Sequence, residues 1–229
     1  MRPFIVAIDG PAGAGKSTVS KLLARRLGFA LVDTGAIYRC VALMARHESI
    51  ASDDDAKLGE LLGRIHIHFQ VVGEENRVLL DGKDVSSEIR TPEISMGASQ
   101  VSSRPVVRSG LLALQRRLAL EAEKGAILEG RDIGTVVFPD ADAKFFLQAS
   151  PEVRARRRFE ELFQKGVEAS LEQVLADQTQ RDRDDSARAV APLKAAEDAI
   201  RVDSSSLPLS EVVHEMEKEI QRRLAQRGS

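Results

Sequence analysis

Short apolar runs alternate along this chain with longer stretches in which apolar residues recur every three or four positions. Five runs flanked by Gly, Pro, Asp or Ser predict strands: FIVAI (4–8), FALVD (29–33), AILEG (126–130), AKFFLQA (143–149) and AIRVDS (199–204). Helical spacing between these runs, as at Val19, Leu22, Leu23 and Leu27, predicts helices. The alternation favours an α/β fold with a five-stranded parallel sheet that is flanked by helices on both faces.

One region departs from this alternation. Its segments predict strand, turn, strand and a further extended piece: IHIHFQVV (65–72), GEEN (73–76), RVLLDG (77–82) and KDVSSEIR (83–90). The first of them alternates apolar and polar residues, which is typical of a half-buried strand. We therefore expect a small antiparallel insert at about residues 64–98, within a single domain that spans residues 1–229.

Composition and charge limit the class of protein. The chain has 229 residues, 43% of them hydrophobic, which suffices for one core. Its 35 acidic and 33 basic residues nearly cancel, so no overall positive field favours nucleic acid as a partner. The single Cys40 excludes an internal disulfide, and no run approaches the roughly 18 apolar residues of a membrane span. We expect a cytoplasmic protein, and a monomer because no extended apolar surface stripe is evident.

The stretch GPAGAGKST follows the first predicted strand and opens the first predicted helix. It is a complete G-x-x-x-x-G-K-[ST] phosphate-binding loop, or P-loop. Its glycines permit backbone angles closed to other residues, Lys16 can reach the β- and γ-phosphates, and the Ser17 hydroxyl can ligate Mg²⁺. The residues that we expect to hold a nucleoside triphosphate are Gly10, Pro11, Ala12, Gly13, Ala14, Gly15, Lys16, Ser17 and Thr18. The loop does not say what receives the phosphate.

A guanine-nucleotide switch is disfavoured, because the N-K-x-D signature is missing and the one Asn in the chain, Asn76, lies in the predicted GEEN turn. The second predicted strand runs into DTGAIYR (33–39), at a strand end where ligands of open α/β sheets collect. Thr34 can cap the next helix there, so this motif also fits a capped helix with a surface arginine.

Two later motifs bring charged residues together. EGRDIGTVVFPDA (129–141) places Glu129, Arg131 and Asp132 beside a glycine-rich turn, where charges are costly to bury without a ligand or partner. In RDRDDSAR (181–188) the spacing puts Arg181, Asp185 and Arg188 on one helix face, which also fits an ion-pair ladder on a helix surface. RARRR (154–158) fits a solvated helix face or a basic patch, but no aromatic residues are interleaved with it to support nucleic-acid binding.

Five motifs of this chain, taken in order, closely resemble those of bacterial cytidylate kinases. They are GPAGAGKST, DTGAIYR, ASQVS (98–102), EGRDIGTVVFPDA and RDRDDSARAVAPL (181–193). The resemblance covers nearly the whole chain. It implies a P-loop kinase fold in which the antiparallel insert binds the monophosphate and a helical lid, at about residues 150–168, contains RARRR. It also implies that the γ-phosphate of ATP passes to CMP or dCMP with Mg²⁺ present.

The resemblance assigns roles residue by residue. Arg39, Arg131 and Arg188 would hold the acceptor phosphate and, with Lys16, act in catalysis. Arg181 and Asp185 would contact the ribose. Cytosine would be read by Ser99, Arg108 and Asp132, in a pocket bordered by Thr34 and Tyr38, with Glu129 and Gly130 beside it. Thr34 stands where the family often has Ser, and Glu129 where it often has Asp, which leaves the functional groups but alters the fine geometry.

An arginine-rich, histidine-poor site suits phosphoryl transfer, because its loose transition state needs positioning and cations more than a strong general base. The lid arginine that stabilises the negative charge of the transferred phosphate can be Arg154, Arg157 or Arg158. The residues leave two other functional classes open: a kinase of the same fold with a different acceptor, and a nucleotide-dependent switch that transfers no phosphate. We expect Cys40 to be a small buried residue rather than a nucleophile.

Overall fold

A computed structural model describes residues 2–73, 75–164 and 166–227. Its main sheet contains five parallel strands, which confirms the five predicted from the apolar runs. They are β1 (Phe4–Asp9), β2 (Ala30–Asp33), β6 (Gly125–Gly130), β7 (Ala143–Gln148) and β8 (Ile200–Asp203). Their order across the sheet is β2-β6-β1-β7-β8, so β1 lies at the centre.

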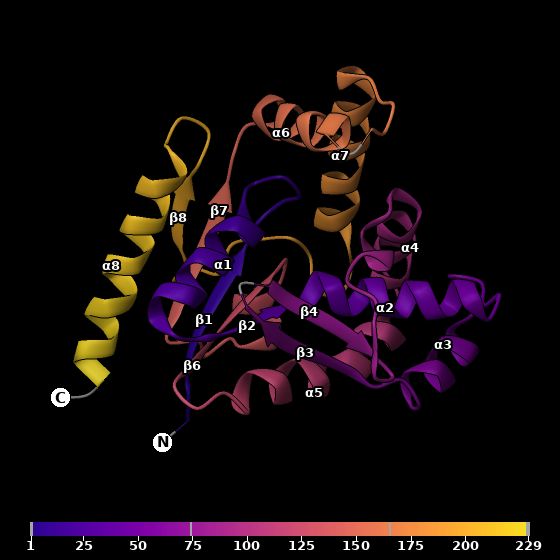
Figure 1. Cartoon of the computed structure of the whole chain (residues 1–229), viewed down its shortest axis with the longest axis horizontal. Helices are drawn as coiled ribbons and strands as arrows, with labels where there is room; N and C mark the ends of the chain where they lie inside the picture. Colours follow the sequence, from indigo (N-terminus) through magenta and orange to yellow (C-terminus); the bar gives the residue numbers. More distant parts are fainter. Residues whose placement is uncertain (1, 74, 165, 228–229) are drawn as a thin grey trace.

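Helices cover both faces of this sheet (Figure 1). The helices α1 (Lys16–Leu27) and α8 (Leu209–Arg227) pack on one face, and α2 (Thr34–His47) and α5 (Pro105–Leu120) pack on the other. Successive residues of β1 point to opposite faces, so Val6 and Ile8 join the first core while Ile5 and Ala7 join the second. This two-sided burial explains why the strand is a continuous apolar run.

The insert forms a separate antiparallel sheet, as the alternating pattern predicts. Its strands are β3 (Ile67–Val72), β4 (Glu75–Leu80) and β5 (Lys83–Asp84), after the helix α3 (Asp55–Leu62) and before a 3-10 turn (Glu88–Arg90) and α4 (Pro92–Ser102). In Figure 1, β3 and β4 lie in front of the main sheet.

Two details of the insert differ from the prediction. Asn76 lies in β4, opposite Val71, rather than in a turn, and its side-chain amide donates to the carbonyl of Leu31 at 3.0 Å; Glu74 lies outside the described residues. The segment 83–90 is extended only at Lys83–Asp84. Beyond Asp84 the Val85 N–H still donates to the Val78 carbonyl at 3.0 Å, but the Val78 N–H donates to the Ser86 hydroxyl at 2.9 Å in place of a backbone carbonyl, and the strand ends.

A helical hairpin lies above the sheet, at the top of Figure 1. It consists of α6 (Pro151–Gln164) and α7 (Leu171–Ala187), which pack through a small apolar cluster of Ala155, Leu162 and Val174. The region expected as the lid, 150–168, contains α6, and α6 packs against α7. Ser170 begins α7 by accepting a hydrogen bond from the backbone N–H of Gln173 at 3.1 Å.

The start of α2 corrects one sequence prediction. Asp33, rather than Thr34, caps the helix, because its carboxylate accepts from the backbone N–H of Ala36 at 2.9 Å. A carboxylate suits the partial positive charge at a helix start. The Thr34 hydroxyl instead donates to the carbonyl of Glu129 at 2.7 Å, which joins α2 to the end of β6.

None of the helices within residues 2–73, 75–164 and 166–227 combines the length and apolar character that crossing a membrane requires.

Candidate active site

The carboxyl ends of the central strands carry the candidate residues. Parallel pairing places Asp33 of β2 opposite Glu129 of β6, and Asp9 of β1 opposite Gly130. Gly130 leaves room for its neighbours here, because a Cβ would lie 2.7 Å from the Ile133 side chain and 2.8 Å from the Thr34 hydroxyl and would force them to shift. The register thus gathers residues from three motifs at one edge of the sheet, where open α/β sheets bind ligands.

The P-loop adopts the glycine-dependent backbone that its sequence predicts. Gly10, Gly13 and Gly15 have φ values of 147°, 76° and 89°. Gly10 is the most constrained of these, since a Cβ there would lie 1.9 Å from the carbonyl oxygen of Leu147. The loop can therefore present backbone amides to a phosphate ahead of α1.

Lys16 points back into this loop. Its Nζ donates to the carbonyl oxygens of Gly10 and Pro11, each at 2.7 Å. Burial, followed by the positive charge of Arg131, lowers the pKa of the Lys16 ammonium. A buried ammonium beside another cation favours a site that receives an anion.

Ser17 and Glu129 form the neighbouring contact. The Ser17 hydroxyl donates to Glu129 Oε2 at 2.9 Å. Burial, followed by the negative charge of Asp33, raises the pKa of Glu129 to about 7. Within the described residues no three His, Cys, Asp or Glu side chains gather as a metal-binding group. The hydroxyl and carboxylate oxygens of this pair are nevertheless the kind of ligand that Mg²⁺ takes together with substrate phosphates.

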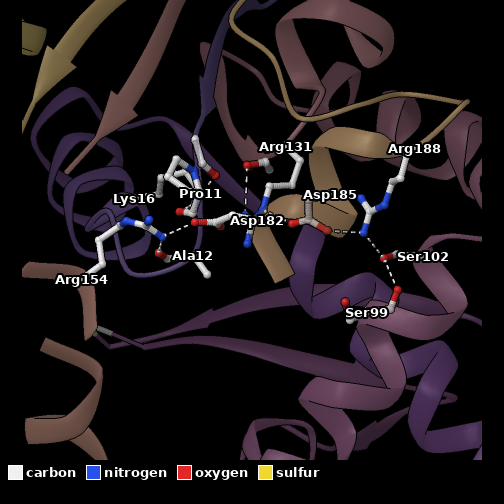
Figure 2. Close-up of polar contacts among 12 residues, drawn as sticks. Pro11, Ala12, Lys16, Ser99, Ser102, Arg131, Arg154, Asp182, Asp185 and Arg188 are labelled. Atoms are coloured by element: carbon white, nitrogen blue, oxygen red, sulfur yellow. Dashed lines mark hydrogen bonds and ion pairs between the residues drawn. The ribbon is translucent and has the colours of Figure 1, made fainter. Parts of the chain in front are cut away.

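Arginines from three segments meet beside the P-loop: α2, the turn after β6 and the end of α7. Arg131 Nε lies 3.0 Å from Asp185 Oδ2, and the other Asp185 oxygen pairs with Arg188 (Figure 2). Arg39 pairs with Asp33 at 2.9 Å. Burial, and then the nearby Arg131, lower the pKa of Arg181 to about 10.

Two of these arginines retain buried donors. The Nε atoms of Arg39 and Arg181 are buried without a hydrogen-bond partner in the part of the chain that the structure describes. Unpaired donors cost free energy when buried, so the cluster is suited to an anionic ligand that would accept from them.

A second buried pair lies farther along the same edge. Arg108 Nη2 is 2.5 Å from Asp132 Oδ2, and the exposed fractions of the two side chains are 7% and 9%. The Arg108 guanidinium also lies 5.5 Å from the centre of the Tyr38 ring and donates to the carbonyl of Ser102 at 3.0 Å. This arrangement combines an aromatic face, a carboxylate acceptor and guanidinium donors, as a polar planar ligand requires.

Ser102 connects this pair to the arginine cluster, and Figure 2 shows its contacts with Arg188 and Ser99. Its hydroxyl accepts from Arg188 Nη2 at 3.0 Å and donates to the carbonyl of Ser99 at 2.9 Å. The candidates Ser99, Arg108, Asp132, Asp185 and Arg188 therefore belong to one connected network.

Comparison with known proteins agrees with this geometry. The sequence model of the family described as cytidylate kinase matches residues 6–222. The chain belongs to the cytidylate kinase family. It is 57% identical to the cytidylate kinase of Geobacter sp. (strain M21) over 222 residues, which cover 97% of this chain and 94% of that protein. It is 53% identical to the cytidylate kinase of Geobacter sulfurreducens with the same coverage of both chains.

A solved structure shares the fold at much lower sequence identity. The gluconokinase from Sinorhizobium meliloti 1021 superposes with a TM-score of 0.51 at 16% identity, covering 99% of this chain and 96% of that one. This likeness supports a P-loop kinase fold for the present chain and carries no information about its acceptor.

The three arginines of α6 that we expect to belong to a lid differ in their contacts. Arg154 donates to the carbonyl of Ala12 in the P-loop at 3.0 Å and pairs with Asp182 of α7 at 2.6 Å (Figure 2). Arg157 donates to the carbonyl of Ser204 at 2.6 Å, and its Nη1 would lie 3.9 Å from a Cβ at Gly15. Arg158 instead pairs with Glu161 on α6.

Sequence reasoning missed four residues of this network as site residues: Asp9, Asp33, Ser102 and Asp182. Asp9 and Asp33 could have been found, because each is the last residue of a strand that runs into a recognised motif. Ser102 and Asp182 lie within the motifs ASQVS and RDRDDSAR, but nothing in the sequence pairs them with Arg188 and Arg154, which lie 86 and 28 positions away.

Proposed function

We propose that this protein transfers the γ-phosphate of ATP to CMP or dCMP. The supporting observation is that one sheet edge carries a P-loop, an arginine cluster and the buried Arg108–Asp132 pair, of which the last two are connected through Ser102. Such an arrangement offers separate places for a donor phosphate, an acceptor phosphate and a polar base. It accounts for an acceptor as well as a donor, which a nucleotide switch would not need.

The donor would be held by residues 10–18. The loop amides and the start of α1 would surround the phosphates of ATP, and Lys16 would exchange its two backbone carbonyls for phosphate oxygens. A bound phosphate would also offset the cost of burying this ammonium. Lys16 would then neutralise charge that develops as the γ-phosphate leaves.

Ser17 and Glu129 fit a Mg²⁺ site, because both contribute oxygen and already lie 2.9 Å apart. When bound, the ion would neutralise charge on the phosphates. The role of Glu129 in this proposal is to hold that position beside Ser17, and the longer Glu in place of Asp keeps the carboxylate.

The acceptor phosphate would lie among Arg39, Arg131 and Arg188. In the structure Asp185 bridges two of them, and Asp33 pairs with the third. These carboxylates hold the guanidinium groups in place and limit the repulsion among them. The ribose would contact Arg181 and Asp185, which leaves the unpaired Nε of Arg181 available to a ligand oxygen.

The base would lie against Tyr38, with Thr34 at the edge of the pocket. Cytosine presents an amino donor at N4, whereas the corresponding O4 of a uracil-type base is an acceptor. Asp132 would accept from the amino group while Arg108 and Ser99 serve the ring acceptors. The O4 of uracil would then point a lone pair at the Asp132 carboxylate, and the desolvated donors of the pocket would be left unpaired.

Substitution of Asp132 tests this assignment. We expect Asp132→Asn to lower the CMP-to-UMP ratio of kcat/KM by about tenfold or more, because a pocket based on buried polar pairs discriminates through those pairs. The loss should fall mainly on CMP, with the KM for ATP little changed. The matched control is Asp140→Asn, which removes an exposed carboxylate of the same segment, 74% exposed, and should keep the parent ratio. An Asp132→Asn enzyme with the parent preference would exclude Asp132 as the residue that reads the base.

The insert at about 64–98, the lid at about 150–168, the cytoplasmic location and the monomeric state stay predictions.

A further inference from the structure

Asp9 is a buried carboxylate that the assignments above do not use. It is the last residue of β1, directly before Gly10 of the P-loop, and its exposed fraction is 3%. Both of its oxygens accept backbone hydrogen bonds: Oδ1 from the N–H of Ile133 and Oδ2 from the N–H of Gly134, each at 2.8 Å. These amides belong to the two residues that follow Asp132.

The two amides need an external acceptor. Residues Ile133–Val137 form a short π-helical turn, and the first amides of any helix lack partners within it. The closing bonds of this turn run from the amides of Val136 and Val137 to the carbonyl of Asp132, at 2.9 and 3.2 Å. Asp9 therefore caps the turn from a different strand, and single π-turns are often found at functional sites.

The position of Asp132 follows from this cap. Asp132 is the residue that precedes the turn, with φ −143° and ψ 22°. On its other side, Gly130 is packed so closely that a Cβ would contact Ile133 at 2.7 Å. The backbone on both sides of Asp132 is thus held, while its carboxylate meets Arg108 at 2.5 Å. A shift of the turn would move this carboxylate relative to a bound base.

We infer that Asp9 is a positioning residue for recognition of the acceptor base: by holding the amides of Ile133 and Gly134 it fixes Asp132 in the base pocket. The inference rests on the proposed role of Asp132 in reading cytosine. Because Asp9 also adjoins the P-loop, one carboxylate ties the donor loop to the acceptor pocket. Its effect on catalysis passes through Asp132 and not through contact with a reacting atom.

Asp9→Asn is the direct test, since it keeps the shape but turns an amide group toward one of two backbone N–H donors. We expect the KM for CMP to rise and the CMP-to-UMP ratio of kcat/KM to fall by about fivefold or more, because misplacement of a buried polar contact forfeits discrimination. The KM for ATP should change by less than the KM for CMP. Asp9→Ser, whose hydroxyl can accept from one N–H while its own hydrogen rotates away from both amides, should fall between Asp9→Asn and the parent and serves if Asp9→Asn does not fold.

Asp142→Asn is the matched control. Asp142 Oδ2 accepts from the backbone N–H of Ile5 at 2.7 Å, near the other end of the same strand, and pairs with Arg2 at 2.9 Å. It should lower the thermal midpoint without changing the CMP-to-UMP ratio. A purely structural Asp9 would behave in the same way, with loss of stability and an unchanged ratio, and that result would overturn the inference.

Asp132→Asn, measured alongside, distinguishes a failure of the inference about Asp9 from a failure of the assignment of Asp132 to the base. If it lowers the ratio while both Asp9 variants keep the parent value, Asp9 does not position Asp132 and the inference is wrong. If neither Asp132→Asn nor the Asp9 variants lower the ratio, the base assignment itself is wrong, and the inference falls with it.

Discussion

Asp9, Lys16 and Glu129 are charged side chains buried at neighbouring strand ends, and burial shifts the pKa of each toward its neutral form. Burial raises the pKa of Asp9 to about 6 and that of Glu129 to about 7. Groups that are costly to keep charged in the free protein are characteristic of binding sites. At the scale of the residue, burying these charges costs stability in the free protein, and the same buried charges can interact strongly with a bound ligand.

The pKa of Asp9 gives a prediction for stability against pH. Between the unfolded value of about 4 and the folded value of about 6, the folded protein holds more protons at Asp9 than the unfolded chain does. The stability that Asp9 contributes in its neutral form is therefore lost as pH rises through this window. Asp9→Asn cannot lose this proton, so its free energy of unfolding relative to the parent should rise between pH 4 and 6, by on the order of 1–3 kcal/mol.

Urea unfolding of the parent and of Asp9→Asn at several pH values measures this difference. Other charged groups lie around Asp9 and the turn after it, and they are present in both proteins, so their contributions to the difference in unfolding free energy cancel to first order. These groups are Lys16, Glu129, Asp132 and Lys144. A constant offset between the two proteins over pH 4–6 would show that Asp9 has no raised pKa.

Individual residues also show where sequence reasoning stops. The roles of Gly10, Gly13 and Gly15 in the loop backbone could be predicted because a local pattern requires their φ values. The cap of α2 was assigned wrongly to Thr34, because both Asp33 and Thr34 are good caps and the choice depends on the carbonyl of Glu129, a distant residue. Local chemistry offers the alternatives, and tertiary contacts select among them.

Among the elements, the α6–α7 hairpin contacts the P-loop. Arg154 at the start of α6 is 4% exposed and bonds to Ala12, Ala149 and Asp182 at once. Gly13 of the P-loop lies so close that a Cβ there would be 3.0 Å from Arg154 Cβ and 3.1 Å from the Gln178 amide. Of the three arginines expected in the lid, Arg154 is therefore the one that donates a hydrogen bond to the P-loop.

We predict that Arg154→Ala lowers kcat by about tenfold or more, because it removes a buried cation beside the loop that holds the donor phosphates. Arg156→Ala, at an exposed position of the same helix, is the control and should stay within about twofold of the parent, as expected for a surface change. Steady-state rates with saturating ATP and CMP distinguish the two. Equal kcat values for the Arg154 and Arg156 variants would mean that another lid arginine carries this role.

The strands were the most predictable elements, since a sheet buried on both faces requires apolar runs such as Phe4–Ile8. Their order across the sheet is not encoded in any one run, and the pairing of Asp33 with Glu129 follows only from that order. The extended piece predicted at 83–90 was mostly wrong, because the Ser86 hydroxyl takes the place of a backbone acceptor for Val78 and the strand ends after two residues.

At the scale of the whole molecule, we expect two parts outside the parallel sheet to move: the insert and the α6–α7 hairpin. An ATP site open to water would lose its γ-phosphate to hydrolysis, so we expect both to close when donor and acceptor are bound. The tips of the two parts carry exposed residues: Val71 is 72% exposed and Phe163 is 76% exposed.

Spin labels at Val71→Cys and Phe163→Cys measure this closure. The native Cys40 should not be labelled, because it is buried and burial raises the pKa of its thiol to about 12. We expect the distance between the labels to shorten with CMP and a non-hydrolysable ATP analogue together, and by less with either alone. An unchanged distance distribution in the ternary complex would contradict closure.

The central claim is that the γ-phosphate passes from ATP to a cytidine monophosphate, and following the fate of that phosphate tests it most directly. With ATP labelled at the γ-position and CMP, dCMP, UMP, AMP or GMP as acceptor, we expect the label to appear in CDP and dCDP far faster than in the other products. ADP should form mole for mole with them, and Lys16→Ala, folded as judged by circular dichroism, should transfer almost none. Label released mainly as inorganic phosphate, or transferred equally well to UMP or a purine monophosphate, would contradict the account.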